Sequence, residues 1–324
     1  MNISLRVYDD VSQLIGSREN ATPMVRLRKL PPPGSGAIFA KLEWMNPFGS
    51  IKDRTARYLL EGLRRDGRLA GKRIVEPTSG NTGIAIAALA NLLGVPCTIT
   101  IPSGAPEEKI AMLRLLGAEV WPTPDDLCPI DHPKDGAIAL ARTFVTGEST
   151  RDQYVMPNQY ENTDNVRAHY EGTGPEIWDQ TEGRVTHFFA GYGTCGTITG
   201  AAKFLKERNP GVRVIAIEPE KGHRLSGLKN FQESNKPAIL DESIIDKTVC
   251  VPDGSAYETA IRLAREESLL VGPSTGAIVW AALQEELPED AVAACISPDN
   301  AFKYATHYAP HIANDGIPTV AVTA

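Results

Sequence analysis

Short hydrophobic runs alternate with amphipathic segments along almost the whole chain. The hydrophobic runs are nearly continuous, which is typical of strands covered on both faces, and the amphipathic segments have helical spacing. We expect strands at 37–42, 73–75, 96–101, 118–121, 185–189, 212–217 and 291–296, and helices at 53–65, 82–93, 107–116, 197–207, 257–267 and 277–286. This alternation predicts an α/β fold with parallel sheets and right-handed crossovers.

The length of 324 residues favours two lobes or one large domain. The segment 122–134 is rich in proline and aspartate and predicts a surface loop. No internal repeat or low-complexity tract divides the rest of the chain.

Composition and charge exclude several classes of protein. A net charge of −7 argues against a general nucleic-acid or anionic-membrane binder. The five cysteines are widely spaced and form no C-x-x-C pair, so we expect no disulfide framework and no metal site. The N-terminus lacks the apolar core of a signal peptide, and no stretch approaches the roughly 20 apolar residues of a membrane span. We therefore expect a cytoplasmic protein.

A lysine at the start of a predicted helix is the first candidate for chemistry. The segment 46–54 (NPFGSIKDR) breaks the chain with proline and glycine just before the helix that Lys52 would begin. The partial positive charge of a helix N-terminus, together with burial, would lower the pKa of Lys52 and leave a neutral amine for Schiff-base formation. An ordinary solvated lysine is the simpler interpretation.

The segment 76–83 (EPTSGNTG) lies between a predicted strand and an alanine-rich helix. Thr78, Ser79, Asn81 and Thr82 place side-chain donors beside the backbone N–H groups of a helix start. This arrangement favours a site for a carboxylate or a phosphate, because helix capping alone needs only one such residue.

The segment 191–200 (GYGTCGTITG) follows a strand and matches the G-x-G-x-x-G pattern of dinucleotide binding, with Glu218 about 20 residues further on. Its extra threonines are also typical of a site for a phosphate monoester, held by hydroxyls and backbone N–H groups. The loop alone leaves both interpretations open.

The segment 271–277 (VGPSTGA) forms another turn before an apolar helix, where Ser274 or Thr275 would serve as an N-cap if taken alone. Taken together, the four segments supply a lysine, a carboxylate-sized site, a phosphate-sized site and a further hydroxyl. An aldehyde cofactor with one phosphate needs this set, whereas dinucleotide chemistry would leave Lys52 and 76–83 unexplained.

These motifs, with TGPEIW at 173–178, resemble the cysteine synthase and cystathionine β-synthase family from about residue 22 to residue 304. The resemblance implies a two-lobed, fold-type II pyridoxal-phosphate enzyme, similar to the tryptophan synthase β subunit, with parallel-sheet lobes. It further implies a larger cofactor-binding lobe at 1–41 and 161–324, a smaller mobile lobe at 42–160, and a homodimer.

The resemblance also implies a role for each matching residue. Lys52 would hold the cofactor's aldehyde and remove the Cα proton, and Asn81 would bind the ring hydroxyl. The α-carboxylate of the substrate would be held by Thr78, Ser79, Thr82 and Gln159. The phosphate would be surrounded by Gly193, Thr194, Cys195, Gly196 and Thr197, and Ser274 would meet the pyridine nitrogen. Cys195 stands where the family usually has glycine.

The implied reaction replaces the β-substituent of an activated serine with a sulfur nucleophile to give L-cysteine. Cystathionine formation from serine and homocysteine, β-replacement by a nitrogen nucleophile, and an NAD-dependent oxidoreductase are the alternatives. Four basic residues (Lys221, His223, Arg224 and Lys229) fall within nine positions that hold no acid. Taken alone, this cluster is typical of a solvated basic loop. Lys229 also resembles an arginine position of the O-phosphoserine-using cysteine synthases, so we expect it to bind the donor's phosphate, with the donor either O-phosphoserine or O-acetylserine.

Overall fold

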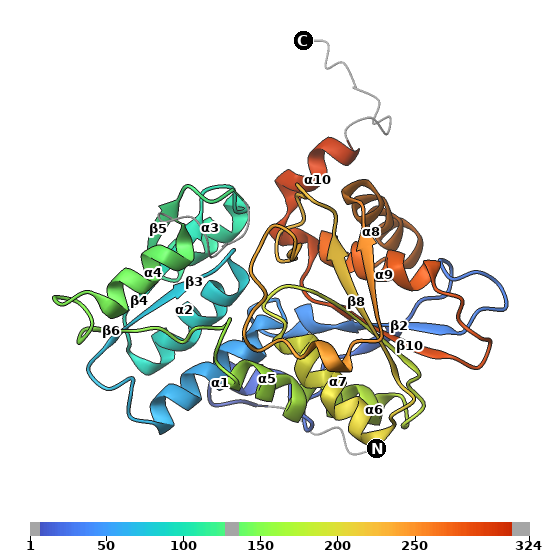
Figure 1. The fold of residues 1–324 in the computed structure, drawn as a ribbon, viewed down its shortest axis with the longest axis horizontal. Coiled ribbons are helices and arrows are strands. Elements are labelled where there is room, and N and C mark those ends of the chain that lie inside the picture. Colours follow the sequence, from blue (N-terminus) through green and yellow to red (C-terminus); the bar gives the residue numbers. More distant parts are fainter. Residues whose placement is uncertain (1–6, 127–135, 313–324) are drawn as a thin grey trace, which may run out of the picture.

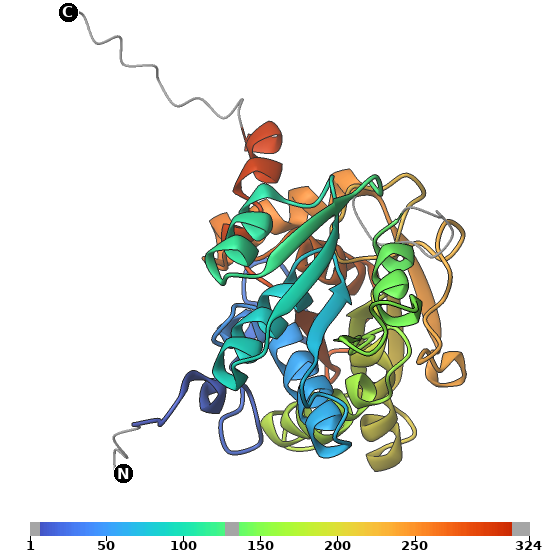
Figure 2. The same ribbon diagram turned by 90° about the vertical axis from the view of Figure 1, so that its left-hand side faces the viewer.

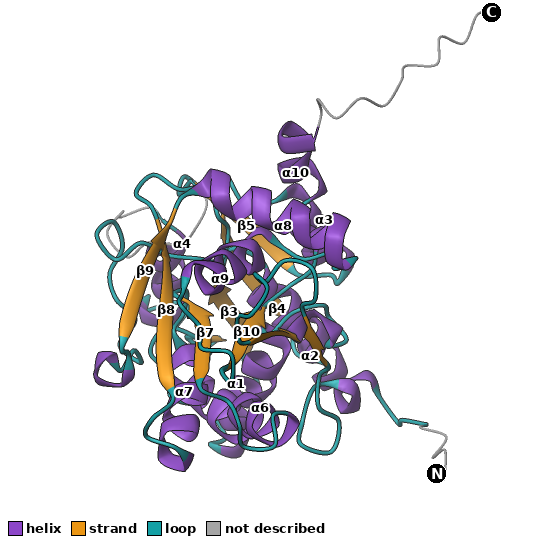
Figure 3. Ribbon diagram, turned by 90° about the vertical axis from the view of Figure 1, so that its right-hand side faces the viewer, coloured by secondary structure: helices purple, strands orange, loops and turns teal. Residues whose placement is uncertain are grey.

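The computed structural model describes residues 7–126 and 136–312, whose strands form two separate sheets (Figure 1). The larger sheet has the order β1 (Met24–Arg26), β2 (Ala37–Leu42), β10 (Val292–Ser297), β7 (His187–Gly191), β8 (Arg213–Pro219) and β9 (Lys247–Val251). β1 pairs antiparallel with β2, and the other neighbours are parallel. As Figures 1 and 3 show, α8 (Asp253–Glu267) and α9 (Pro273–Gln284) lie on one side of this sheet, and α6 (Gly174–Gln180) and α7 (Gly196–Arg208) lie on the other.

The smaller sheet is wholly parallel and has the order β5 (Glu119–Thr123), β4 (Cys97–Pro102), β3 (Arg73–Pro77) and β6 (Tyr154–Val155) (Figure 2). Successive side chains of β4 point to opposite faces of the sheet. Ile99 and Ile101 pack in a core with α2 (Asn81–Leu93). Thr100 lies on the face toward α4 (Ala137–Thr146), and its hydroxyl donates to the carbonyl of Ala137 at 2.8 Å.

Each sheet has its own hydrophobic core, and we call the two parts the larger lobe and the smaller lobe. Ile51 still packs in the core of the larger lobe, whereas Ala56 and Leu60 pack in that of the smaller lobe. Ile15, far from these residues in sequence, also packs in the smaller lobe. The boundaries at 42 and 160 stay a prediction, and the side-chain packing changes from one core to the other between 51 and 56.

The fold class predicted from the sequence is confirmed, and each predicted strand and helix has a counterpart. The predicted starts of α8 and α9 are wrong, because these helices begin at Asp253 and Pro273. Proline is tolerated in a first helical turn, so the apparent turn before 277 is already helix. Pro122 and Thr123 belong to β5 rather than to the predicted loop, and 127–134 lie outside the described residues.

Several short elements were not predicted. Strands β1, β6 and β9 are edge strands and therefore lack a long buried run. Helices α1 (Lys52–Arg65) and α3 (Glu107–Leu115) match predicted helices. The other unpredicted elements include α5 (Asp164–Ala168), α10 (Ala305–Ile312), the π-helical turn η3 (His169–Thr173), and the 3₁₀ turns η1 (Val11–Leu14), η2 (Glu43–Met45), η4 (Glu242–Ile244) and η5 (Ala301–Lys303). Within 7–126 and 136–312, the helices are too short or too polar to cross a membrane.

A buried ion network fixes α1 against the larger lobe. The Arg54 guanidinium binds Glu43 at 2.7 Å and both carboxylate oxygens of Glu176, at 2.5 and 2.7 Å. Lys41 binds Glu176 at 2.6 Å, and all four side chains are buried. Two cations balance two anions, so each buried charge has an opposite partner that offsets the cost of its desolvation. It ties α1, β2, η2 and α6 together.

Glu76, which is buried in β3, supports a turn after β6. Its two oxygens accept hydrogen bonds from the backbone N–H groups of Asn158 at 2.8 Å and Gln159 at 3.0 Å. Burial raises the pKa of Glu76 to about 8, although these two N–H groups lower it. The position of Gln159 thus depends on a buried carboxyl group of the smaller sheet.

We predict that Arg54→Met lowers the free energy of unfolding by about 3–5 kcal/mol, because it leaves two buried glutamates without their main partner. Urea unfolding of the cofactor-free protein measures this loss. Arg64→Met, an exposed change on the same helix, is the control and should stay within about 0.5 kcal/mol of the unchanged protein. A loss below about 1 kcal/mol for Arg54→Met would contradict the structural role of the network.

The raised pKa of Glu76 predicts a pH dependence of stability. Between its ordinary value of 4.5 and about 8, the folded protein binds a proton that the unfolded chain has lost. This stabilisation is fully present below about 4.5 and disappears as the pH rises through about 8. Stability relative to a Glu76→Gln variant should therefore fall from about pH 5 to about pH 8 in urea unfolding. A difference that is constant across this range would show that Glu76 ionises normally.

Candidate active site

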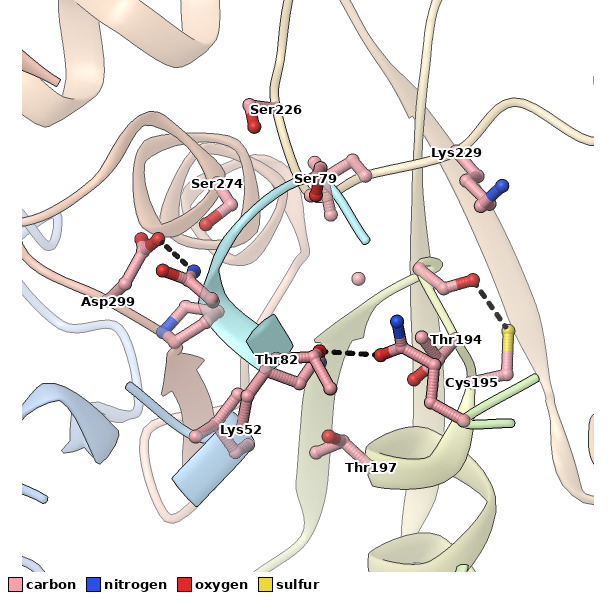
Figure 4. A pocket seen from close by; sticks show the side chains of 18 of the residues that line it. Lys52, Ser79, Thr82, Thr194, Cys195, Thr197, Ser226, Lys229, Ser274 and Asp299 are labelled. Atoms are coloured by element: carbon pink, nitrogen blue, oxygen red, sulfur yellow. Dashed lines mark hydrogen bonds between the residues drawn. The ribbon is translucent and has the colours of Figure 1, made fainter. Parts of the chain in front are cut away.

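A cavity lies between the two lobes, at the carboxyl ends of β3, β7 and β10 (Figure 4). Ligands of parallel α/β folds bind at such strand ends. The predicted site residues that line the cavity are Lys52, Thr78, Ser79, Asn81, Thr82, Gln159, Gly193, Thr194, Cys195, Thr197, Lys229 and Ser274. The remaining predicted residue, Gly196, is buried behind the cavity wall as the first residue of α7.

Lys52 begins α1, as the sequence predicts, and its side chain lines the cavity. Desolvation lowers its pKa, while the nearby Asp299 carboxylate raises it. The N-terminal end of α1 also disfavours the protonated form. Lys52 therefore loses its proton more readily than a surface lysine, which makes its amine available as a nucleophile and as a base.

The turn between β3 and α2 is a candidate anion site in the smaller lobe. The residue that precedes α2 is Gly80, and no side chain caps the helix, so the capping interpretation of this segment is wrong. Thr82 donates to the side-chain oxygen of Gln159 at 2.6 Å, and Gln159 donates to the carbonyl of Pro77 at 2.9 Å. Ser79 and the N-terminal end of α2 border the cavity, where a carboxylate would find several donors.

The loop between β7 and α7 forms a second anion site, in the larger lobe. Asn165 donates to the hydroxyl of Thr194 at 3.1 Å, and the His169 ring nitrogen Nε2 lies 3.3 Å from the hydroxyl of Thr197. Burial lowers the pKa of His169 to about 3, so its ring stays neutral. Asn165 and His169 were not predicted, because only the fold brings α5 and η3 behind this loop.

Cys195 adopts the left-handed conformation, with φ 66°, at the residue before α7. A side chain is disfavoured there, which fits the glycine usual in the family. Its sulfur lies 3.8 Å from the carbonyl oxygen of Gly193, and burial raises the thiol pKa to about 12. The thiol therefore stays protonated, and Cys195 can offer its backbone N–H to an anion.

Ser274 lies in the first turn of α9, and Gly272 precedes this helix without any side-chain cap. The N-cap interpretation of Ser274 and Thr275 is therefore wrong. The Ser274 hydroxyl borders the cavity, while Thr275 lies 3.0 Å from the hydroxyl of Ser297. Ser274 thus offers a neutral hydrogen-bonding group to a ligand in the cavity.

The amide of Asn81 is held at both ends. Its nitrogen donates to the Asp299 carboxylate at 2.6 Å, and its oxygen accepts from Lys303 at 3.2 Å. The amide nitrogen keeps one further hydrogen for a ligand. Asp299 and Lys303 were not predicted, although an acid directly after a strand that ends at the cavity is a signal that could have identified Asp299.

Among the four clustered basic residues, Lys229 lines the cavity. Its ammonium lies 5.1 Å from the centre of the Tyr160 ring, on the side of the cavity where Cys195 lies (Figure 4). Lys221 and Arg224 are exposed, and Arg224 pairs with Asp126. The basic segment at 221–229 thus lies mostly on the surface, and Lys229 is its cation at the cavity.

The residue that a dinucleotide site would require does not reach the cavity. Glu218, at the end of β8, accepts a hydrogen bond from the backbone N–H of Phe231 at 2.7 Å. It is not among the residues that border the cavity. The glycine loop therefore fits a single phosphate better than a dinucleotide.

Comparison with known proteins agrees with this geometry. A cysteine synthase of Aquifex aeolicus is 40% identical over 311 residues, which cover 93% of this chain and 92% of that protein. Cysteine synthase B of Salmonella typhimurium is 36% identical over 275 residues, covering 85% of this chain and 86% of that protein.

Solved structures give a similar result. O-ureido-L-serine synthase is 30% identical with a TM-score of 0.85, and the match covers 97% of each chain. A lysine-to-alanine mutant of O-ureido-L-serine synthase, with O-ureido-L-serine bound, has a TM-score of 0.83. The family model described as pyridoxal-phosphate dependent enzyme matches residues 15–299. The chain therefore belongs to the pyridoxal-phosphate dependent enzymes, and pyridoxal phosphate is its cofactor.

Proposed function

We propose that the protein replaces the β-substituent of an activated serine with a sulfur nucleophile to give L-cysteine. The observation that carries this proposal is that a lysine and two candidate anion sites line one cavity. The N-terminal end of α7, with Thr194 and Thr197, fits the cofactor's phosphate, and Lys52 fits its aldehyde. The turn at 78–82 then remains for the carboxylate of an amino acid. The names of the curated relatives point to cysteine as the product.

Pyridoxal phosphate, when bound, withdraws electrons from the substrate's Cα through its conjugated ring. Lys52, with its lowered pKa, takes the proton from Cα as a base. Thr78, Ser79 and Thr82 bind the α-carboxylate and so orient the Cα–H bond toward this amine. The donor's β-substituent leaves with the electron pair of the Cβ–O bond. The sulfur nucleophile then bonds to Cβ, and Lys52 returns the proton to Cα.

Ser274 suits elimination better than an acid would at the same place. A carboxylate beside the pyridine nitrogen would keep that nitrogen protonated and make the ring a strong electron sink. The Ser274 hydroxyl carries no charge, so it stabilises charge on the ring less strongly. Loss of the β-substituent can then compete with other reactions of the substrate at Cα.

A second candidate is synthesis of another β-substituted alanine, since O-ureido-L-serine synthase has a similar structure. Cystathionine formation and replacement by a nitrogen nucleophile use the same site chemistry. The 40% identity to a cysteine synthase, against 30% to O-ureido-L-serine synthase, favours a sulfur nucleophile.

We also propose that Lys229 binds the phosphate of O-phosphoserine, so that this donor is used at least as well as O-acetylserine. Its buried side chain borders the cavity beside the 226–228 segment. A charged hydrogen bond to phosphate has no equivalent in an uncharged acetyl ester.

We also propose that the protein is a cytoplasmic homodimer. The free thiols of Cys97, Cys195, Cys250 and Cys295 support a cytoplasmic location, because the cytoplasm keeps cysteines reduced.

We predict that Lys52→Ala abolishes turnover and removes the visible absorption band of the lysine-bound cofactor, because the variant lacks the amine that the aldehyde needs. Absorbance spectra and a cysteine-formation assay measure both effects, and circular dichroism checks the fold. Lys203→Ala, an exposed change on α7, is the control. Full activity of Lys52→Ala would disprove the assignment.

We predict that Lys229→Ala reduces kcat/KM for O-phosphoserine about 10- to 150-fold, equivalent to about 1.5–3 kcal/mol for a charged hydrogen bond. The value for O-acetylserine should change little, because the acetyl group offers no charge to Lys229. Lys221→Ala, an exposed change in the same basic segment, is the matched control. Equal losses for the two donors would rule out a phosphate contact.

A further inference from the structure

Lys109 is a fully buried lysine that the proposed function does not use. It lies in the first turn of α3, in the smaller lobe, where the helix dipole disfavours a cation. Burial of an ammonium group is also costly. A lysine at this position therefore needs favourable contacts from outside its own helix.

Those contacts come from the larger lobe. The Lys109 ammonium donates to the hydroxyl of Tyr304 at 2.7 Å and to that of Ser226 at 3.4 Å. It lies 4.2 Å from the centre of the Tyr304 ring and 3.9 Å from the Asp299 carboxylate. Tyr304 follows η5, and Ser226 borders the cavity. One side chain thus links α3 to two segments across the junction of the lobes.

The contact with Tyr304 continues to the amide of Asn81. The Tyr304 hydroxyl donates to Asp299 Oδ2 at 2.5 Å, and the same oxygen accepts from Asn81 at 2.6 Å. Asp299 Oδ1 is buried and has no hydrogen-bond partner among the described residues. Tyr304 and Asn81 therefore hold the orientation of this carboxylate, and the carboxylate in turn holds the amide that faces the cofactor.

The aliphatic part of Lys109 lies against the anion site of the smaller lobe. A Cβ atom added to Gly80 would lie 2.6 Å from Cδ of Lys109 and 2.8 Å from its Cβ. Gly80 has φ 128°, a conformation that favours glycine, so the turn at 78–82 leaves space for this lysine. Lys109 therefore contacts the carboxylate-binding turn with its stem and the Asn81–Asp299–Tyr304 chain with its charge.

We propose that Lys109 is a positioning residue that couples the carboxylate-binding turn of the smaller lobe to the cofactor-facing amide of Asn81, through Tyr304 and Asp299. This inference rests on the proposed function, with Asn81 binding the ring hydroxyl of the cofactor as the family resemblance implies. Lys109 holds the two lobes in the arrangement that brings both anion sites to one cavity. Removal of Lys109 changes how the cofactor and the substrate carboxylate are bound. This change in binding comes in addition to any loss of stability.

The test uses the cofactor-loaded protein and three variants. Lys109→Met removes the charge at similar length, Tyr304→Phe removes one hydroxyl, and Arg114→Met is an exposed control on the same helix. The visible absorption band reports the surroundings of the cofactor ring. Titration with L-alanine, which has an α-carboxylate but no leaving group, reports the carboxylate site. Urea unfolding of the cofactor-free proteins reports stability.

Lys109→Met and Tyr304→Phe should both shift the absorption band and weaken L-alanine binding by about tenfold or more, the equivalent of one lost charged hydrogen bond. Arg114→Met should leave both readouts unchanged. If the two variants only lower stability and keep the band and the L-alanine affinity of the unchanged protein, Lys109 has a merely structural role. If the unchanged protein itself shows no band with pyridoxal phosphate, the proposed site fails, and the coupling with it.

Discussion

The active site depends on the buried ion network around Arg54. Helix α1 packs its apolar side in the core of the smaller lobe, yet Arg54 binds Glu43 and Glu176, which belong to segments of the larger lobe. Lys52 lies two residues before Arg54 on the same helix, so the network fixes where its amine enters the cavity. A helix shared in this way brings Lys52 into a cavity that both lobes line.

Four helices begin at the cavity, namely α1, α2, α7 and α9. Each directs the positive end of its dipole and unpaired backbone N–H groups toward the same space. Within a chain of net charge −7, they create a local preference for anions. A cofactor phosphate and a substrate carboxylate match that preference at two separate places. The same field favours loss of the proton from Lys52, which the chemistry needs.

The sequence predicted those cavity-lining residues that lie in short local motifs. Lys52 and the turn at 78–82 stand out because glycine, proline and hydroxyl residues cluster directly before a helix. His169 and Lys109 could not be found in this way. Each contacts partners more than 25 residues away, such as Thr197 for His169 and Tyr304 for Lys109. Hydrophobic periodicity predicted the buried strands, while the short edge strands β1, β6 and β9 carry too weak a pattern.

The identity of the lysine that holds the cofactor can be measured directly. Several other lysines are buried near the cavity, among them Lys109, Lys229 and Lys303. The protein is loaded with pyridoxal phosphate, reduced with borohydride to make the lysine attachment permanent, and digested for peptide mass analysis. We expect the added mass on the peptide that contains Lys52. Its recovery on a peptide with any other lysine would show that Lys52 does not hold the cofactor.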